Sequence, residues 1–203
     1  MNNTAYPIHG AGLGLRRDFI AAAAENPPCQ VDFWEVAPEN WIGIGGRAAR
    51  LFRSLTERFP FVCHGLSLSI GSPAPLDIEF LKRLKAFLDD NGIRAYTEHL
   101  SYCSDGGQLY DLMPIPFTEE AVRHVAARVR RVQDVLERPV ALENVSYYAA
   151  PGKELDEIDF VNAVLTEHLR KFDQSRLRRG RFPGPPSGRA NRLRPRSGTL
   201  RRG

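Results

Sequence analysis

Four successive segments of the chain end in a carboxylate or an imidazole, each directly after a short apolar run. In chain order these residues are Glu35, followed by Glu39 and Asn40, then His64, Glu98 with His99, and Glu143 with Asn144. One histidine at the end of a strand is usually a hydrogen-bonded structural residue, but four such ends in register favour a shared site. Two imidazoles with one or more carboxylates suit iron, manganese or zinc. The sequence therefore predicts a metal centre where these strands end.

An α/β fold with a parallel sheet would bring these ends together. Runs of β-forming residues predict strands at 8–15, 31–36, 61–66, 95–99 and 140–144, and helical spacing predicts helices at 17–25, 47–58, 77–91, 118–136 and 154–168. The run Asp105-Gly106-Gly107 predicts a short hairpin that reaches Leu112. Because strands alternate with helices, the crossovers are expected to be right-handed and the C-terminal strand ends to share one edge.

Two architectures fit this pattern of β-α units. A doubly wound open sheet is complete with about five strands. A TIM barrel needs eight units and about 250 residues, so this chain would supply five-eighths of one. Composition does not choose between the two.

The glycine-rich opening at residues 9–15 is a rival site, because it resembles a dinucleotide-binding loop. That fingerprint requires a third glycine where this chain has Leu15, and Asp32 lies inside the next predicted strand rather than at its end. We interpret the glycines as small residues that let the first strand pack closely.

Composition indicates a globular protein rather than a membrane protein. Hydrophobic residues make up 42% of the 203 positions, and no apolar run approaches the roughly 20 residues that span a bilayer. The start of the chain has no secretion-signal pattern, and its cysteines, Cys29, Cys63 and Cys103, form no C-x-x-C pair. We therefore expect a cytoplasmic protein. Cys63 directly precedes His64 and would face the opposite side of a strand, as a buried core thiol.

Charge divides the chain into an acidic body, residues 1–168, and a basic tail, residues 169–203. Residues 170–203 hold twelve Lys and Arg against one acid, Asp173, a net charge of +11, whereas residues 1–169 carry −7. The tail lacks apolar periodicity and is rich in Arg, Pro and Gly, which predicts disorder when it is isolated. A nucleic-acid-binding role would show steep salt dependence. Because the tail has no folded scaffold and few aromatic residues, nucleic acid is not the favoured partner.

Six motifs together resemble one enzyme family. They are GLGLR at 12–16, FWEVAPENWI at 33–42, HGLSLSIGS at 64–72, EHLSY at 98–102, DLMPIPFTEEAV at 111–122 and ALENVSYY at 141–148. In this order and spacing they resemble the MbnB-like family of methanobactin biosynthesis, multinuclear non-haem iron oxidases with a TIM barrel similar to that of xylose isomerase. The resemblance covers residues 8–167 and implies an incomplete barrel of five units.

The resemblance also implies ligands, cofactors and partners. His64, His99 and Glu143 match metal ligands of the family, with Glu143 bridging two irons. Outer or substrate-side positions would be taken by Glu35, Asn40 and Asn144. Studied members bind two or three irons and use dioxygen to modify cysteines of ribosomally made precursor peptides, usually with a partner protein that presents the peptide.

The family's later motifs do not follow Glu167. These motifs supply further His, Asp and Glu ligands, so the resemblance implies an incomplete cluster and an inactive oxidase. Back-translation of residues 173–177 in a shifted frame allows a reading similar to the Asn-Asn-Val-Tyr run of the family's sixth strand. We therefore expect residues 169–203 to be an out-of-frame translation.

One further alternative uses the same residue types. Another TIM-barrel enzyme, such as a sugar isomerase or an endonuclease-like hydrolase, would carry zinc, magnesium or manganese instead of iron. Metal analysis would separate it from the iron oxidase.

Overall fold

The computed structural model describes residues 7–145, 152 and 154–169 of the chain. The chain divides into two units, Met1–Asp173 and Gln174–Gly203, and every described residue belongs to the first. The basic tail predicted at residues 169–203 therefore lies outside the described residues, apart from the backbone of Leu169.

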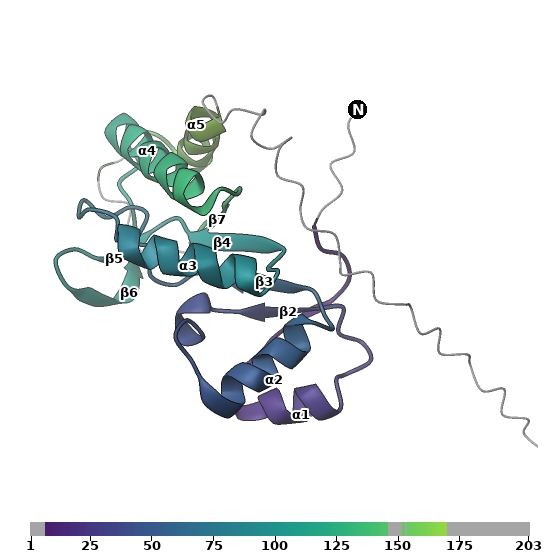
Figure 1. The fold of residues 1–203 in the computed structure, drawn as a ribbon. Coiled ribbons are helices and arrows are strands. Elements are labelled where there is room, and N and C mark those ends of the chain that lie inside the picture. The colour runs from purple at the N-terminus through teal and green to yellow at the C-terminus, as the bar shows by residue number, and fades with distance from the viewer. Residues whose placement is uncertain (1–6, 146–151, 153, 170–203) are drawn as a thin grey trace, which may run out of the picture. The chain divides into compact units, whose positions relative to one another are not determined.

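A five-stranded parallel sheet forms the centre of the described region (Figure 1). Its strands are β1 (Gly12–Gly14), β2 (Phe33–Val36), β3 (Phe61–His64), β4 (Ala95–His99) and β7 (Ala141–Glu143). They lie side by side in the order in which they occur along the chain, and every neighbouring pair is parallel. A doubly wound sheet reverses its strand order at a switch point, whereas a TIM barrel keeps sequential order. The described sheet is a partial TIM-barrel arrangement.

The helices connect the strands, and side chains cap the starts of α3 and α4. They are η1 (Arg17–Phe19), α1 (Ile20–Glu25), η2 (Pro38–Asn40), α2 (Gly46–Thr56), α3 (Ile78–Asp90), α4 (Glu119–Leu136) and α5 (Glu157–Leu169). The Asp77 carboxylate accepts the N–H of Phe80 at the start of α3, and the Thr118 hydroxyl accepts the N–H of Ala121 at the start of α4. Each cap satisfies a backbone donor that has no partner inside its helix. The sequence Thr118-Glu119-Glu120 predicts an N-cap at Thr118, and the structure confirms it.

Alternation along the strands gives the sheet one apolar face. Trp34 and Val36 on β2, and Phe61 and Cys63 on β3, are at most 2% exposed, whereas the residues between them are more accessible. This face packs against amphipathic helices, such as α3 with its buried Leu81, Leu84 and Leu88. The prediction that Cys63 is a core thiol is confirmed.

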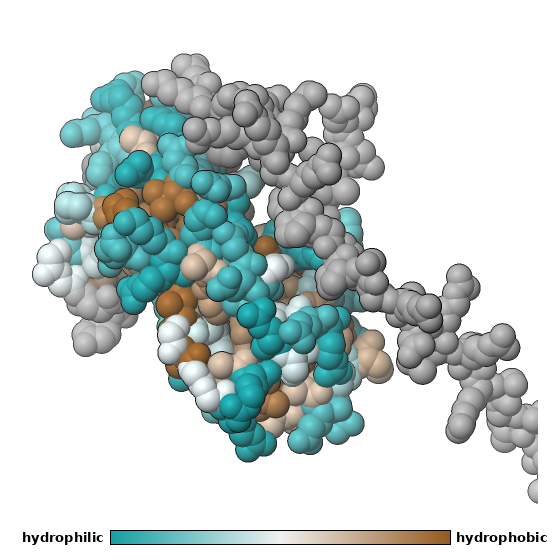
Figure 2. All heavy atoms as spheres, viewed as in Figure 1, coloured by the Kyte–Doolittle hydropathy of each residue, from teal (hydrophilic) through white to brown (hydrophobic). Residues whose placement is uncertain are grey.

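Aromatic rings tie the helices to this face of the sheet. Phe52 of α2 stacks on Trp41 at a centroid distance of 4.5 Å and on Phe87 of α3 at 5.7 Å, and meets Phe61 edge-on at 5.3 Å. Fully burying a phenylalanine contributes about 1.5–3 kcal/mol, so this cluster is a main stabilising element. On the molecular face in Figure 2, hydrophilic residues cover most of the described surface, and apolar side chains show only as separate patches.

The predicted hairpin is present between β4 and α4. Its strands, β5 (Tyr102–Ser104) and β6 (Gln108–Met113), are antiparallel, and Gly106 has the positive φ of 66° that the turn requires. Ser69 fixes the hairpin to the loop after β3, because its hydroxyl oxygen accepts the N–H groups of Cys103 and Ser104. The hairpin therefore stands next to the C-terminal ends of β3 and β4.

The first strand is shorter than the predicted 8–15. β1 begins at Gly12, because Gly10 turns the chain with a φ of 91° and the Asp32 carboxylate accepts the N–H of Ala11. A side chain at Gly12 would collide with the ring of Phe33. Gly12 is a packing residue, as interpreted from the sequence, whereas Gly10 is a turn residue and a methyl group added at Gly14 would meet no atom within 4 Å. The Asp32 carboxylate is occupied by the same segment.

No helix in the described part of the chain is long and apolar enough to cross a membrane.

The three thiols should react at different rates with a thiol reagent at pH 8. Cys29 is exposed, whereas Cys63 and Cys103 are buried, and burial raises the pKa of both buried thiols. Because the thiolate is the reactive form, we expect one fast thiol in the folded protein and three after unfolding in guanidinium. Replacement of Cys29 by Ser should remove the fast phase. Two or more fast thiols in the folded protein would contradict this burial pattern.

Candidate metal centre

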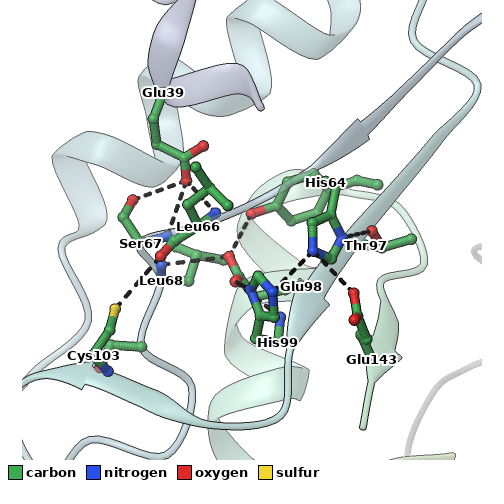
Figure 3. A network of polar contacts seen from close by, with 12 residues as sticks. Glu39, His64, Leu66, Ser67, Leu68, Thr97, Glu98, His99, Cys103 and Glu143 are labelled. Atoms are coloured by element: carbon green, nitrogen blue, oxygen red, sulfur yellow. Dashed lines mark hydrogen bonds and ion pairs between the residues drawn. The ribbon is translucent and has the colours of Figure 1, made fainter. Parts of the chain in front are cut away.

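Three side chains from neighbouring strand ends point at one place (Figure 3). The Nε2 atom of His64 lies 3.0 Å from Nε2 of His99 and 3.0 Å from Oε2 of Glu143. One ligand atom from each of the three residues lies within 4.8 Å of the other two. The structure thus brings together the three residues that the sequence predicted as ligands.

Strand register explains this convergence. His64 on β3 is opposite Thr97 on β4, and His99 on β4 is opposite Glu143 on β7. Thr97 and His99 are two residues apart, so they share one face of β4. The three donor side chains therefore stand on the sheet face opposite the aromatic core, at the C-terminal edge where barrel enzymes place their active sites.

Each histidine ring has a neighbouring polar group at its Nδ1 atom, on the side away from the other two donors. Nδ1 of His64 lies 2.5 Å from the Thr97 hydroxyl, which itself donates to the carbonyl of Cys63 at 3.5 Å. The Thr97 hydroxyl thus holds the His64 ring from the side away from the site. Nε2 of His64 faces the other two donors, and a histidine whose second ring nitrogen is held in this way is the arrangement found at metal sites.

His99 has the corresponding contact with a carboxylate. Its Nδ1 atom lies 3.5 Å from Oε1 of Glu98, and this contact raises the pKa of His99. The distance is that of an ion pair rather than of a short hydrogen bond, and Nδ1 is buried with no hydrogen-bond partner among the described residues. Both imidazoles thus turn Nδ1 outward and Nε2 toward the shared point.

The donor set and its spacing fit a metal ion. Two bonds of about 2.1 Å at a right angle hold their donor atoms about 3.0 Å apart, close to both measured donor separations. The side chains of His99 and His64 are 13% and 20% exposed, and that of Glu143 is 54% exposed. The histidines are held by the fold, while the carboxylate side remains accessible to another molecule.

The loop after β3 is held by two carboxylates. Oε1 of Glu39 accepts the N–H groups of Leu66 and Ser67 and the Ser67 hydroxyl, at 2.8, 3.0 and 2.9 Å. Oε2 of Glu98 accepts the N–H of Leu68 at 3.4 Å and the Tyr96 hydroxyl at 2.9 Å. Burial and the Glu98 carboxylate raise the pKa of Tyr96, so its hydroxyl stays protonated and donates.

The other predicted site residues have no contact with the three donors among the described interactions. Glu35 is exposed on β2, where it pairs with Val62, two residues before His64. Asn40 is exposed in η2, and its carbonyl accepts a hydrogen bond from Arg17. The Asn144 amide donates to Glu157 at 2.6 Å, so this side chain fixes the start of α5.

Two other histidines are placed away from the site. His9 is exposed before β1. The neighbouring Arg123, Arg128 and Arg130 in the sequence predict a surface position for His124, but it is partly buried on α4, and its Nε2 atom lies 2.9 Å from the carbonyl of Ser72. This prediction is wrong because the loop before α3 contacts that side of α4. His168, expected at the end of the last helix, has a side chain outside the described residues.

Sequence reasoning missed Thr97, and it named Glu98 and Glu39 as strand-end carboxylates without predicting what they contact. Alternation along β4 did indicate that Glu98 is buried, because Tyr96, two residues earlier on the same face, is in the core. A carboxylate at a core-facing position must have hydrogen-bond donors nearby. Which donors these are depends on a loop some 30 residues away and has no local signature.

The sequence matches one family model and several curated proteins. The model, described as "RiPP precursor modification enzyme MbnB/TglH/ChrH", matches residues 10–168. Similar proteins, each named UPF0276 protein, are those of Shewanella amazonensis, 63% identical over 157 residues, Shewanella sediminis, 62% over 156, and Pseudomonas aeruginosa, 62% over 160. These matches cover 77–79% of this chain and 56% of each relative, so the chain spans about half the length of the relatives it matches.

Replacement of Gly65 by Ala should destabilise the protein by about 1–3 kcal/mol, because a methyl group there collides with the Tyr96 hydroxyl and the Glu98 carboxylate. Gly14→Ala is the matched control, since no atom lies within 4 Å of the position of its added methyl group. Urea unfolding of both variants measures the difference. Equal stability of the two variants would show that the close approach of Gly65, Tyr96 and Glu98 is not needed.

Proposed function

The chain belongs to the MbnB/TglH/ChrH family of RiPP precursor modification enzymes, and from this premise we propose that it binds non-haem iron through His64, His99 and Glu143. We propose further that the complete enzyme uses dioxygen to modify cysteines of a ribosomally made precursor peptide.

The observation that carries the proposal is the convergence of two imidazoles and one carboxylate on a single point. These are the residue types of the two-histidine, one-carboxylate triad of non-haem iron enzymes, a ligand set that would leave further coordination positions open. Bound iron would supply one-electron chemistry with dioxygen, which side chains alone do not provide. The fit of the site to a metal rests on the donor spacing and on the two outward-turned Nδ1 atoms.

The residues of this chain would bind the metal, orient its ligands and leave one side open to another molecule. Nε2 of His64 and Nε2 of His99 would hold the metal, while Thr97 keeps the His64 ring in place. Glu143 is more than half exposed and stands on β7, the last strand of the described sheet order. Its carboxylate has two oxygens and is therefore suited to bridge a second iron, the role implied by the family.

The peptide, the presenting partner protein and the number of irons are proposals about the whole enzyme. The matched segment is 56% of each relative, so further ligands would come from the part of the relatives that this chain does not match. Three donors suffice to bind one metal ion, whereas multinuclear chemistry needs the complete ligand set.

A second candidate is a hydrolytic or isomerising enzyme with zinc or manganese. The same observation favours it, because two histidines and one glutamate are also the ligands of catalytic zinc in several hydrolases. The metal that supports turnover distinguishes this candidate from an iron oxidase, whereas affinity does not, because most nitrogen and oxygen sites bind Zn²⁺ more tightly than Fe²⁺.

Substitution of His64 or His99 by Ala should weaken binding of Fe²⁺ by more than the roughly 10- to 100-fold that changes in outer partners cost. Fe²⁺ affinity is measured by anaerobic titration, with Zn²⁺ and Mn²⁺ as competitors. His9→Ala is the control, because His9 is exposed and precedes the sheet. Unchanged affinity in the His64 and His99 variants would refute the assignment.

The oxidase proposal is tested with the iron-loaded protein and cysteine-containing peptides. A change in peptide mass that requires both iron and dioxygen would support it. Turnover of a substrate with Zn²⁺ or Mn²⁺, without any dioxygen-dependent mass change, would favour the second candidate.

A further inference from the structure

Glu98 is the most deeply buried carboxylate near the metal centre. Its residue is 1% exposed, and it stands on the core-facing side of β4 beside Tyr96. Burying an ionised carboxylate is costly unless donors or a cation compensate the charge. Apolar packing does not offset the cost of burying the Glu98 carboxylate, so polar neighbours must do so.

Three donors and one imidazole surround this carboxylate. Oε2 accepts the Tyr96 hydroxyl and the N–H of Leu68, and Oε1 accepts the backbone N–H of His99 at 2.9 Å. The same Oε1 lies 3.5 Å from Nδ1 of His99. Across the described ranges, His99 is the one ion-pair partner of Glu98.

The carboxylate curls back over its own strand to reach this histidine. Alternation puts Glu98 and His99 on opposite faces of β4, yet Oε1 bonds to the backbone N–H of His99 and so sits beside its ring. The close approach depends on Gly65, because a side chain there would displace the Glu98 carboxylate. Figure 3 shows Glu98 between the loop after β3 and the His99 ring.

We propose that Glu98 is a positioning residue of the metal centre, whose carboxylate holds the proton of His99 on Nδ1 and so directs the Nε2 lone pair toward His64 and Glu143. This inference rests on the proposed function, since a metal gives that lone pair its use. Glu98 touches no position where the metal would be bound and acts only through His99.

A purely structural role for Glu98 is the competing explanation. The carboxylate also holds the N–H of Leu68, so its loss would loosen the loop after β3 whether or not His99 is affected. Glu39 offers a matched control, because it accepts the neighbouring N–H groups of Leu66 and Ser67 and no described contact links it to either histidine. The two carboxylates thus hold the same loop, but only Glu98 reaches the metal centre.

The test compares the full-length chain with its Glu98→Gln and Glu39→Gln variants. Co²⁺ is the probe, because its visible absorption reports the ligands. We expect Glu98→Gln to weaken Co²⁺ binding by roughly 10- to 100-fold and to change the Co²⁺ spectrum. Glu39→Gln should lower thermal stability and leave affinity and spectrum unchanged. Wild-type affinity and spectrum in Glu98→Gln, or equal losses in both variants, would overturn the proposal.

A second readout works without any metal. The ¹⁵N chemical shifts of the His99 ring show which nitrogen carries the proton. We expect the Nδ1–H tautomer in the metal-free wild type and a shift toward Nε2–H in Glu98→Gln, with no change in Glu39→Gln. An Nε2–H tautomer in the wild type would refute the role of Glu98 even if the protein binds metal. If the wild type binds neither Co²⁺ nor Fe²⁺, the proposed function fails, and the ring shifts still decide the orientation of His99.

Discussion

The parallel register of β3, β4 and β7 is the constraint on which the candidate site depends. It sets His64 opposite Thr97 and His99 opposite Glu143, so that three donors leave one face of the sheet together. A slip of one residue would turn a strand's side chains to the other face. Packing on that other face, from Trp34 to Tyr96, prevents the slip, because exposing these rings would lose several kcal/mol, at about 1.5–3 kcal/mol for each. The core thus fixes the geometry of a site it does not touch.

The loop after β3 joins stability to the site in a second way. Gly65 leaves room for the Tyr96 hydroxyl and the Glu98 carboxylate on β4, and this carboxylate accepts a backbone N–H of the loop. Glu39 of η2 accepts another N–H of the same loop. Buried polar networks of this kind are stabilising only when each member is satisfied. Because Glu98 also faces His99, the groups that order the loop and the groups that orient the ligand are partly the same.

Local pattern was sufficient for much of this structure. The predicted helices and strands agree with the observed elements apart from shifts of a few residues at their ends, the larger shift at β1 and the short helix η2, which was not predicted. Alternation assigned Cys63 to the core and His64 to the opposite face. Alternation gives the face of a strand but not the path of a long side chain, so it could not predict that the Glu98 carboxylate turns back to His99. The burial of His124 likewise depends on the carbonyl of Ser72, 52 residues earlier in the chain.

The three donor side chains differ in how strongly their surroundings restrict them, and this difference has a chemical consequence. His64 and His99 stand on inner strands of the described sheet, and each imidazole has a partner behind it, so little side-chain freedom remains to be lost when they bind a metal. Glu143 stands on a three-residue strand paired only with β4 in the described sheet order, and more than half of its side chain is exposed. A carboxylate of this kind can change between one and two metal contacts without disturbing the core. In the proposed site, the imidazoles would therefore set the position of the metal, and the more exposed carboxylate would allow its coordination to change when another molecule enters.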